Sequence, residues 1–168
     1  MISGFKPIIN QQTRLLVLGT MPSVSSIQEQ FYYAHPRNAF WWIIAQLVNE
    51  PVEHHHLIQL PQKYAWLKQL RLGLWDVLAQ CQREGSLDSA IVRSSEQAND
   101  FATLFAQYPT IDTIICNGQT AHKLLYRHVD ASLYQNKRVV TLPSTSPANA
   151  RLCPEQKLKR WQEVIQAS

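Results

Sequence analysis

Closely spaced cysteine pairs are missing from this chain of 168 residues. Cys81, Cys116 and Cys153 are odd in number and lie far apart. A structural zinc site or an iron–sulfur cluster normally needs four ligands in close pairs, so neither is predicted. The run His54–His56 has no ligand partner at suitable spacing and is expected in a solvated loop. We therefore expect buried, reduced thiols, no metal and no other cofactor.

Long apolar runs are also missing, because the longest, such as residues 39–47, is far shorter than a membrane span. The N-terminal segment has neither a basic start leading into an apolar stretch nor a small-residue cleavage site. Charged residues make up 17% of the chain, too few for a disordered tail. These absences predict a cytoplasmic protein with no membrane contact, folded as a single domain over residues 1–168.

The charge balance leans towards cations. The formal net charge is +4 and the sequence pI is about 9.1. Such a balance suits an anionic partner such as nucleic acid, although many basic proteins never contact one.

Four short apolar runs that predict strands alternate with amphipathic segments that predict helices. The strands are expected at residues 14–18, 74–78, 111–116 and 138–142. The helices are expected at residues 38–47, 64–70, 119–128 and 155–166, with one more running from a cap at Ser94 or Ser95 to Gln107. Strands separated by helices pair in parallel. The pattern predicts an α/β fold of three layers, α/β/α, with a central, mostly parallel four-stranded sheet.

Ligands in such sheets bind beyond the carboxyl ends of the strands. The loops after the first, third and fourth strands are therefore the candidate site: residues 19–38, 117–119 and 143–151. Asp76 is the one carboxylate near these loops that could compete as a catalytic base. Because it falls inside a predicted strand, we expect a structural role for it instead.

Three segments in and beside these loops form recognisable motifs: Gly19–Ser23 (GTMPS), His35–Trp41 (HPRNAFW) and Ser144–Asn149 (STSPAN). Together they resemble the uracil-DNA glycosylase superfamily, and most closely its hypoxanthine-DNA (deoxyinosine) glycosylase branch. The resemblance implies a DNA glycosylase of base excision repair that acts on double-stranded DNA with a damaged base. Such an enzyme flips the deaminated base out of the duplex and hydrolyses its N-glycosidic bond, which leaves an abasic site.

One position departs from the wider superfamily. The third position of the first motif carries a water-positioning Asp or Asn in several branches, whereas this chain has Met21. The resemblance to the hypoxanthine branch makes Asn38 the expected catalytic residue, since its amide can orient water or bond the base edge. The alternative role of Asn38 is a helix N-cap. Ser144 lies where relatives place a His or Asn near the departing base, and would be a weak donor there.

The resemblance also implies a set of base-binding residues: Thr20, Met21, Tyr33, His35 and Asn38. Tyr33 would stack on the extruded base, a contact worth about 1–3 kcal/mol, and its alternative role is core packing. His35 would either stabilise charge on the leaving base or bond the loop backbone.

DNA contacts are expected from residues on all three loops: Arg37, Gly118, Gln119, Ser146, Pro147, Ala148, Asn149 and Arg151. Pro147, Ala148 and Asn149 would fill the space of the extruded nucleotide, and Arg151 would contact a phosphate. Arg37 is either a second phosphate contact or a solvated side chain. The helix that begins after Gly118 could offer free N–H groups to a phosphate.

Lysine is absent from all three loops, so no amine is available there for a Schiff base, and we expect a monofunctional, monomeric enzyme. Two alternatives stay open. A uracil or G/T(U)-mismatch DNA glycosylase would use the same Asn38, because uracil and hypoxanthine both present a carbonyl beside a ring N–H. A non-catalytic α/β nucleic-acid-binding module would explain Met21. A dinucleotide-binding oxidoreductase is disfavoured, because Gly19 is not followed by the further glycines of that fingerprint.

Overall fold

A computed structural model describes residues 1–50, 52 and 58–167, so the run His54–His56 lies outside the described residues. The strands are β1 Ile2–Ser3, β2 Leu15–Gly19, β3 Leu72–Asp76, β4 Leu78–Cys81, β5 Gln97–Ala98, β6 Thr113–Asn117 and β7 Arg138–Leu142. The helices are α1 Val24–Glu29, α2 Phe40–Leu47, α3 Leu60–Leu70, α4 Phe101–Gln107, α5 Gln119–His128 and α6 Pro154–Ile165. Short 3₁₀ turns lie at Asp88–Ala90, Arg93–Ser95 and Ala131–Leu133.

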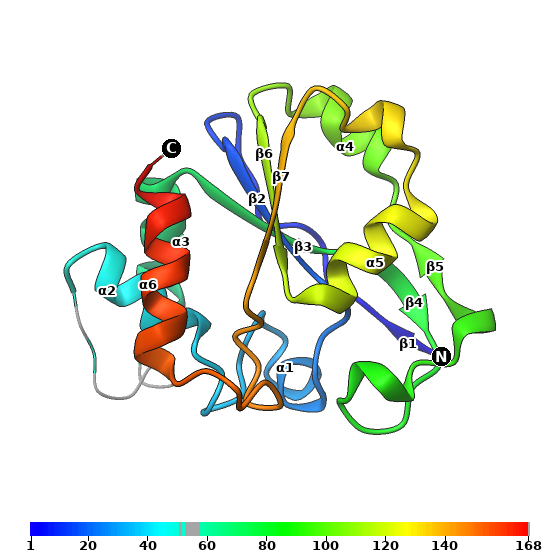
Figure 1. Ribbon diagram of the computed structural model, residues 1–168, viewed down its shortest axis with the longest axis horizontal. Coiled ribbons are helices and arrows are strands. Elements are labelled where there is room, and N and C mark those ends of the chain that lie inside the picture. The colour runs from blue at the N-terminus through cyan, green and yellow to red at the C-terminus, as the bar shows by residue number, and fades with distance from the viewer. Residues whose placement is uncertain (51, 53–57, 168) are drawn as a thin grey trace.

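The central sheet has four strands in the order β3-β2-β6-β7, and every neighbouring pair is parallel. The predicted four-stranded parallel sheet is therefore confirmed. Its strands all end at the same edge, at Gly19, Asp76, Asn117 and Leu142, which lies toward the bottom of Figure 1.

Helices cover both faces of this sheet (Figure 1): α2, α3 and α6 lie on one side, and α4 and α5 on the other. Strand β2 is continuously apolar because both of its faces are buried. Leu15 and Val17 pack into the core that includes Phe40, whereas Leu16 and Leu18 pack into the core that includes Phe101. Since side chains on both faces of β2 are buried, its sequence lacks the alternation of apolar and polar residues that is typical of a half-exposed strand.

Three expectations drawn from the sequence were wrong, two about the elements and one about the cysteines. The run 74–78 is not one strand, because β3 ends at Asp76 and the chain turns into β4, which pairs antiparallel with β1 and β5 in a second, three-stranded sheet. The helix expected from Ser94 or Ser95 begins only at Phe101. Its cap is Asp100, whose side chain accepts a hydrogen bond from the Thr103 N–H.

The third error concerns the thiols. Cys81 and Cys116 are buried as expected, but Cys153 is exposed at the start of α6.

Within the described residues, no helix is both long and apolar enough to cross a membrane.

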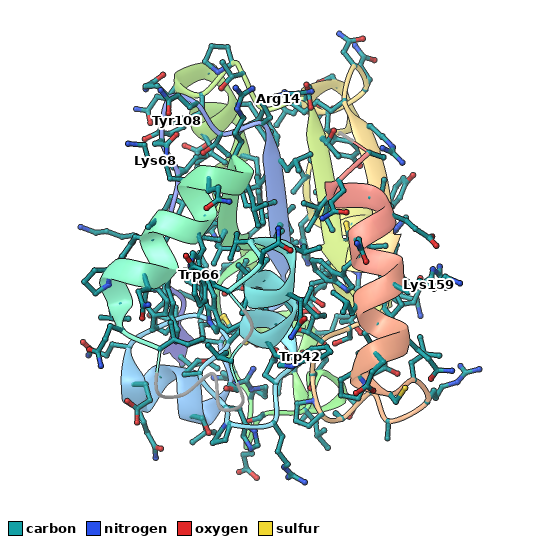
Figure 2. The ribbon with its side chains drawn as sticks, turned by 90° about the vertical axis from the view of Figure 1, so that its left-hand side faces the viewer. Arg14, Trp42, Trp66, Lys68, Tyr108 and Lys159 are labelled. Atoms are coloured by element: carbon teal, nitrogen blue, oxygen red, sulfur yellow. The ribbon has the colours of Figure 1, made fainter. Side chains whose placement is uncertain are left out.

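The opposite end of the sheet carries cations. Arg14 and Lys68 both lie at this upper end in Figure 2, and Arg14 pairs with Asp112 at 2.9 Å. The carboxyl edge, where the three predicted loops gather, is thus separated from these charges by the length of the strands (Figures 1 and 2).

Candidate active site

A pocket of about 400 Å³ opens at the carboxyl edge of the sheet. Its size is typical of a small-molecule site. Five stretches of chain build its walls: the first loop, the end of β3, the end of β6, the connection between β4 and β5, and the loop after β7. The lining residues are Gly19, Thr20, Met21, Pro22, Ser23, Ser26, Tyr32, Tyr33, Asn38, Asp76, Ser86, Leu87, Asp88, Ser89, Asn117, Ser144, Thr145, Ser146, Ala148 and Asn149.

Asn38 lies just before α2 and uses only part of its amide for structure. Its Oδ1 accepts a hydrogen bond of 2.9 Å from the N–H of Phe40, the first residue of α2. The N-cap position itself is Ala39, so the alternative role of Asn38 as the N-cap was wrong by one residue. The bond from Phe40 fixes which way the Asn38 amide faces. Its Nδ2 donates to no other described residue, and Asn38 lines the pocket. The side chain therefore combines an oxygen that bonds the first residue of α2 with an amino group that is available to a ligand.

Asn117, the last residue of β6, ties the loops together. Its Nδ2 donates to Thr145 Oγ1 and its Oδ1 accepts from the Thr145 N–H, both at 3.0 Å. The Thr145 carbonyl in turn accepts the Ala39 N–H at 3.0 Å, next to Asn38. Both Asn117 and Thr145 are buried. A buried amide that bonds through both its oxygen and its nitrogen holds the first and last loops in one register.

Two side chains of α6 donate hydrogen bonds to the backbone of the loop after β7. Lys157 is buried and its Nζ donates to the Ser146 carbonyl, while Trp161 Nε1 donates to the Pro143 carbonyl. Burial lowers the pKa of the Lys157 ammonium. Ser144 Oγ accepts the Ser146 N–H at 3.2 Å, which leaves the Ser144 hydroxyl proton free to turn into the pocket.

Tyr33 lines the pocket and has a strained backbone. Its φ of 55° is in the left-handed region, which a large non-glycine residue rarely adopts. The ring packs on Phe40 with centroids 4.3 Å apart, and the residue also lines the pocket. Its buried Oη has no hydrogen-bond partner in the described part of the chain. Burial, followed by the nearby Asp76 carboxyl, raises the pKa of this phenol.

Asp76 ends β3 inside the same pocket and is 4% exposed. Its Oδ2 is buried with no partner among the described residues. Burial raises the pKa of Asp76 to about 7, the Asp88 charge adds to the rise, and Arg83 opposes it. An unpaired buried polar atom costs roughly 1–3 kcal/mol. The fold therefore keeps two orphan polar atoms, Asp76 Oδ2 and Tyr33 Oη, in the walls of one cavity.

The connection between β4 and β5 closes one side of the pocket. Thr20 Oγ1 donates to Asp88 Oδ2 at 3.2 Å, and the Val24 N–H donates to Ser86 Oγ at 2.9 Å. Arg83 Nη2 reaches the Pro22 carbonyl at 2.5 Å. These hydrogen bonds hold this wall directly against the first loop, at the GTMPS motif and the residue after it.

Eight of the predicted site residues line the pocket: Thr20, Met21, Tyr33, Asn38, Ser144, Ser146, Ala148 and Asn149. Six do not: His35, Arg37, Gly118, Gln119, Pro147 and Arg151. The His35 ring bonds the loop backbone, since its Nδ1 accepts the Arg37 N–H at 3.1 Å. Arg37 and Arg151 are exposed.

Gly118 has a structural role at the start of α5 that the sequence did not predict. Its N–H already donates to the carbonyls of Cys116 and Leu142, both at 3.0 Å, so this group is not free for a phosphate. Its φ is +99°, and a Cβ there would lie 3.0 Å from the Ser144 Cβ. Glycine is therefore needed for the close approach of the last loop, and any phosphate contact at this helix start falls to Gln119 and the amides after it.

The sequence prediction named Asp76 but expected a structural role for it, and it did not single out Asn117, Thr145 or the wall at residues 86–89. A usable signal existed for the first two, because they are the terminal residues of β3 and β6 and strand ends face the ligand in this fold. Because the second strand was expected to run to residue 78, Asp76 was placed inside the strand and not at its end. In the described part of the chain, no group of three or more His, Cys, Asp or Glu residues could hold a metal ion.

Comparison with known proteins agrees with this geometry. The family model of the uracil DNA glycosylase superfamily matches residues 7–165. The chain belongs to the uracil DNA glycosylase superfamily.

Individual relatives extend over nearly the whole chain. A Methanosarcina acetivorans protein named hypoxanthine DNA glycosylase is 35% identical over 164 residues, covering 96% of each chain. A Methanosarcina barkeri protein of the same name is 30% identical over 162 residues, again with 96% of each chain covered. A solution NMR structure of a Methanosarcina acetivorans protein, named as a uracil DNA glycosylase, superposes with a TM-score of 0.78 at 33% identity. That match covers 98% of this chain and 96% of the other.

Proposed function

We propose that this protein is a monofunctional DNA glycosylase that releases hypoxanthine from deoxyinosine in double-stranded DNA and leaves an abasic site. The observation that carries the proposal is the convergence of the three motifs on one pocket, in a chain with 35% identity to a hypoxanthine DNA glycosylase. A pocket recessed behind a strand edge suits a base that has been flipped out of the duplex.

The extruded base would stack on Tyr33, whose other side is supported by Phe40 at 4.3 Å between ring centroids. Thr20 and Met21 would border the base, with Met21 as an apolar wall. His35 lies outside the pocket lining and bonds the Arg37 N–H, so it would shape the loop more than contact the base.

Asn38 would contact the base or the attacking water. Its Nδ2 has no partner among the described residues and can donate to the hypoxanthine carbonyl, while a second lone pair on Oδ1 can orient water. An amide is a poor general base. That is tolerable when the sugar departs as an oxocarbenium-like cation and water attacks late.

The duplex would lie across the carboxyl edge of the sheet. Pro147, Ala148 and Asn149 would occupy the gap left by the flipped nucleotide, with Ser144 and Ser146 facing the base. Arg37, Arg151 and the amides from Gln119 onward would meet phosphates. We expect a monomer acting without metal or cofactor.

A substrate panel tests this function. Duplexes with hypoxanthine, uracil, xanthine or a 5-substituted uracil are incubated with the purified protein, and released base is measured by chromatography. We expect hypoxanthine release at full rate in excess chelator. Strand breaks should appear only after alkali, and borohydride should trap no protein–DNA adduct, because no amine attacks the sugar.

Uracil is the second candidate substrate, since the similar solved structure is named as a uracil DNA glycosylase. Faster release of uracil than of hypoxanthine in the same panel would make that the function. Retention of every base, despite binding to the duplexes, would point instead to a non-catalytic DNA-binding module.

A further inference from the structure

Asp76 is a carboxylate that is buried without an ion-pair partner among the described residues. It lies in the pocket, 4% exposed, and its Oδ2 has no hydrogen-bond partner in the described chain. By contrast, the buried Glu96 carboxylate accepts hydrogen bonds from Arg127 at 2.8 Å and His128 at 2.5 Å. A buried carboxyl group without such partners is stable only when it is neutral and carries its proton.

The local backbone is arranged around this carboxyl group. Gly19 lies opposite Asp76 in the parallel register of β2 and β3. A Cβ on Gly19 would overlap Asp76 Oδ1 and would lie 3.2 Å from Tyr33 Oη. The bare Cα therefore makes the room in which the carboxyl group and the phenol face the same small space at the pocket wall.

We infer that Asp76 is a further catalytic residue, a general acid that delivers its proton to the N7 atom of the extruded hypoxanthine as the glycosidic bond breaks. The inference rests on the proposed function, since it concerns a purine. Asn38 and Ser144 cannot fill this role, because an amide and a hydroxyl group hold their protons too tightly to give one up near neutral pH.

The proton balance is simple. The proton passes from the Asp76 carboxyl to N7, the C1′–N9 bond breaks, and its electron pair stays on N9. Hypoxanthine departs neutral and Asp76 is left as a carboxylate. Water then adds to C1′, and the proton that it gives up restores the acid. The sum is hydrolysis, with no other reactant.

The charged and titratable groups around Asp76 favour this form. Tyr32 and Tyr33 face it from the first loop and are neutral. Asp88, from the wall at residues 86–89, opposes a second negative charge, and Arg83 beyond it partly offsets that effect. Burial, followed by the Asp88 charge, raises the pKa of Asp76 to about 7 against the opposing effect of Arg83, and a general acid is most effective near that value.

Single-turnover release of hypoxanthine between pH 5.5 and 8.5 tests the inference. We expect a wild-type rate that is level at low pH and falls towards tenfold per pH unit once Asp76 ionises. Asp76→Asn keeps the shape and cannot donate a proton. It should be about 100-fold slower at pH 6 and show no alkaline limb. Asp130→Asn, an exposed cap of the 3₁₀ turn at Ala131–Leu133, is the matched control and should keep both rate and limb.

A second measurement needs no variant, so it holds even if Asp76→Asn folds poorly. A duplex with 7-deaza-2′-deoxyinosine lacks the N7 acceptor. The wild-type enzyme should cut it about 100-fold more slowly than deoxyinosine. Equal rates on the two substrates, or an Asp76→Asn enzyme with the wild-type rate and alkaline limb, would overturn the inference while leaving the proposed function intact. Failure of the wild-type enzyme to release hypoxanthine at any pH would overturn both.

Discussion

Gly19 and Asp76 face each other across β2 and β3 so closely that only a glycine allows the Asp76 carboxyl group to sit where it does. The first residue of the GTMPS motif is thus explained by a residue 57 positions away in the sequence (76 − 19). The turn after β2 does not itself require glycine, because Gly19 has no positive φ.

Gly19→Ala should therefore damage the pocket more than an ordinary strand substitution. The new methyl group must displace Asp76 Oδ1, and overpacking of this kind costs typically 1–3 kcal/mol. We expect a lower melting temperature and at least tenfold slower base release. In an Asp76→Ala background the overlap is gone, so Gly19→Ala should then cost much less stability. Additive losses in this double-mutant cycle would mean that the two residues do not compete for the same space.

The buried carboxyl group should make stability depend on pH in a direction opposite to most acidic residues. Burial raises the pKa of Asp76 from 3.8 to about 7 in the folded state. The stabilisation is complete below pH 4 and is lost as the pH rises through 7, because the folded state binds the proton more tightly. Asp76→Asn should be more stable than wild type by on the order of 2–4 kcal/mol at pH 8 and equal at pH 4. Denaturant unfolding at both pH values measures this difference, and a wild type that is more stable at pH 8 would contradict it.

Asn38 should show two separable contributions. Asn38→Ala removes the oxygen that accepts the Phe40 N–H, at a cost of about 1 kcal/mol, and also the pocket amide, which should slow single-turnover release about 10²-fold. Asn38→Asp keeps the oxygen that accepts the Phe40 N–H and loses the Nδ2 donors, so its stability should survive while its rate falls. Near-normal rates for Asn38→Ala, together with a lower melting temperature, would mean that Asn38 has only a structural role at the start of α2.

DNA affinity should depend on few cations. Arg37→Ala and Arg151→Ala should weaken binding to damaged and undamaged duplexes alike, because phosphate contacts carry no base information. The slope of log K against log salt concentration should be shallow, roughly two to four. Lys68→Ala is the matched control, since Lys68 lies at the far end of the sheet (Figure 2) and should leave fluorescence-anisotropy titrations unchanged. A loss confined to damaged DNA would move Arg151 into base recognition.

The sequence by itself determined the layers and the general position of the site. The continuous apolar runs of β2 and β6, the amphipathic helix α5 and the glycines and prolines after the strands follow from local propensity and periodicity, which act over a few residues. The three motifs therefore predicted the right loops, and eleven of their residues line the pocket.

Only the tertiary structure decided which other groups join them. A strand end is poorly marked when apolar residues continue beyond it, as Val77 and Leu78 do after Asp76, so the boundary of β3 depended on pairing with β2. The bonds between Asn117 and Thr145 join residues 28 apart, and the Thr20–Asp88 bond joins residues 68 apart. No local pattern encodes such contacts, because they arise when the sheet brings its strand ends to one edge. The protonation preference of Asp76 has the same origin, since burial is a property of the folded molecule and not of the residue.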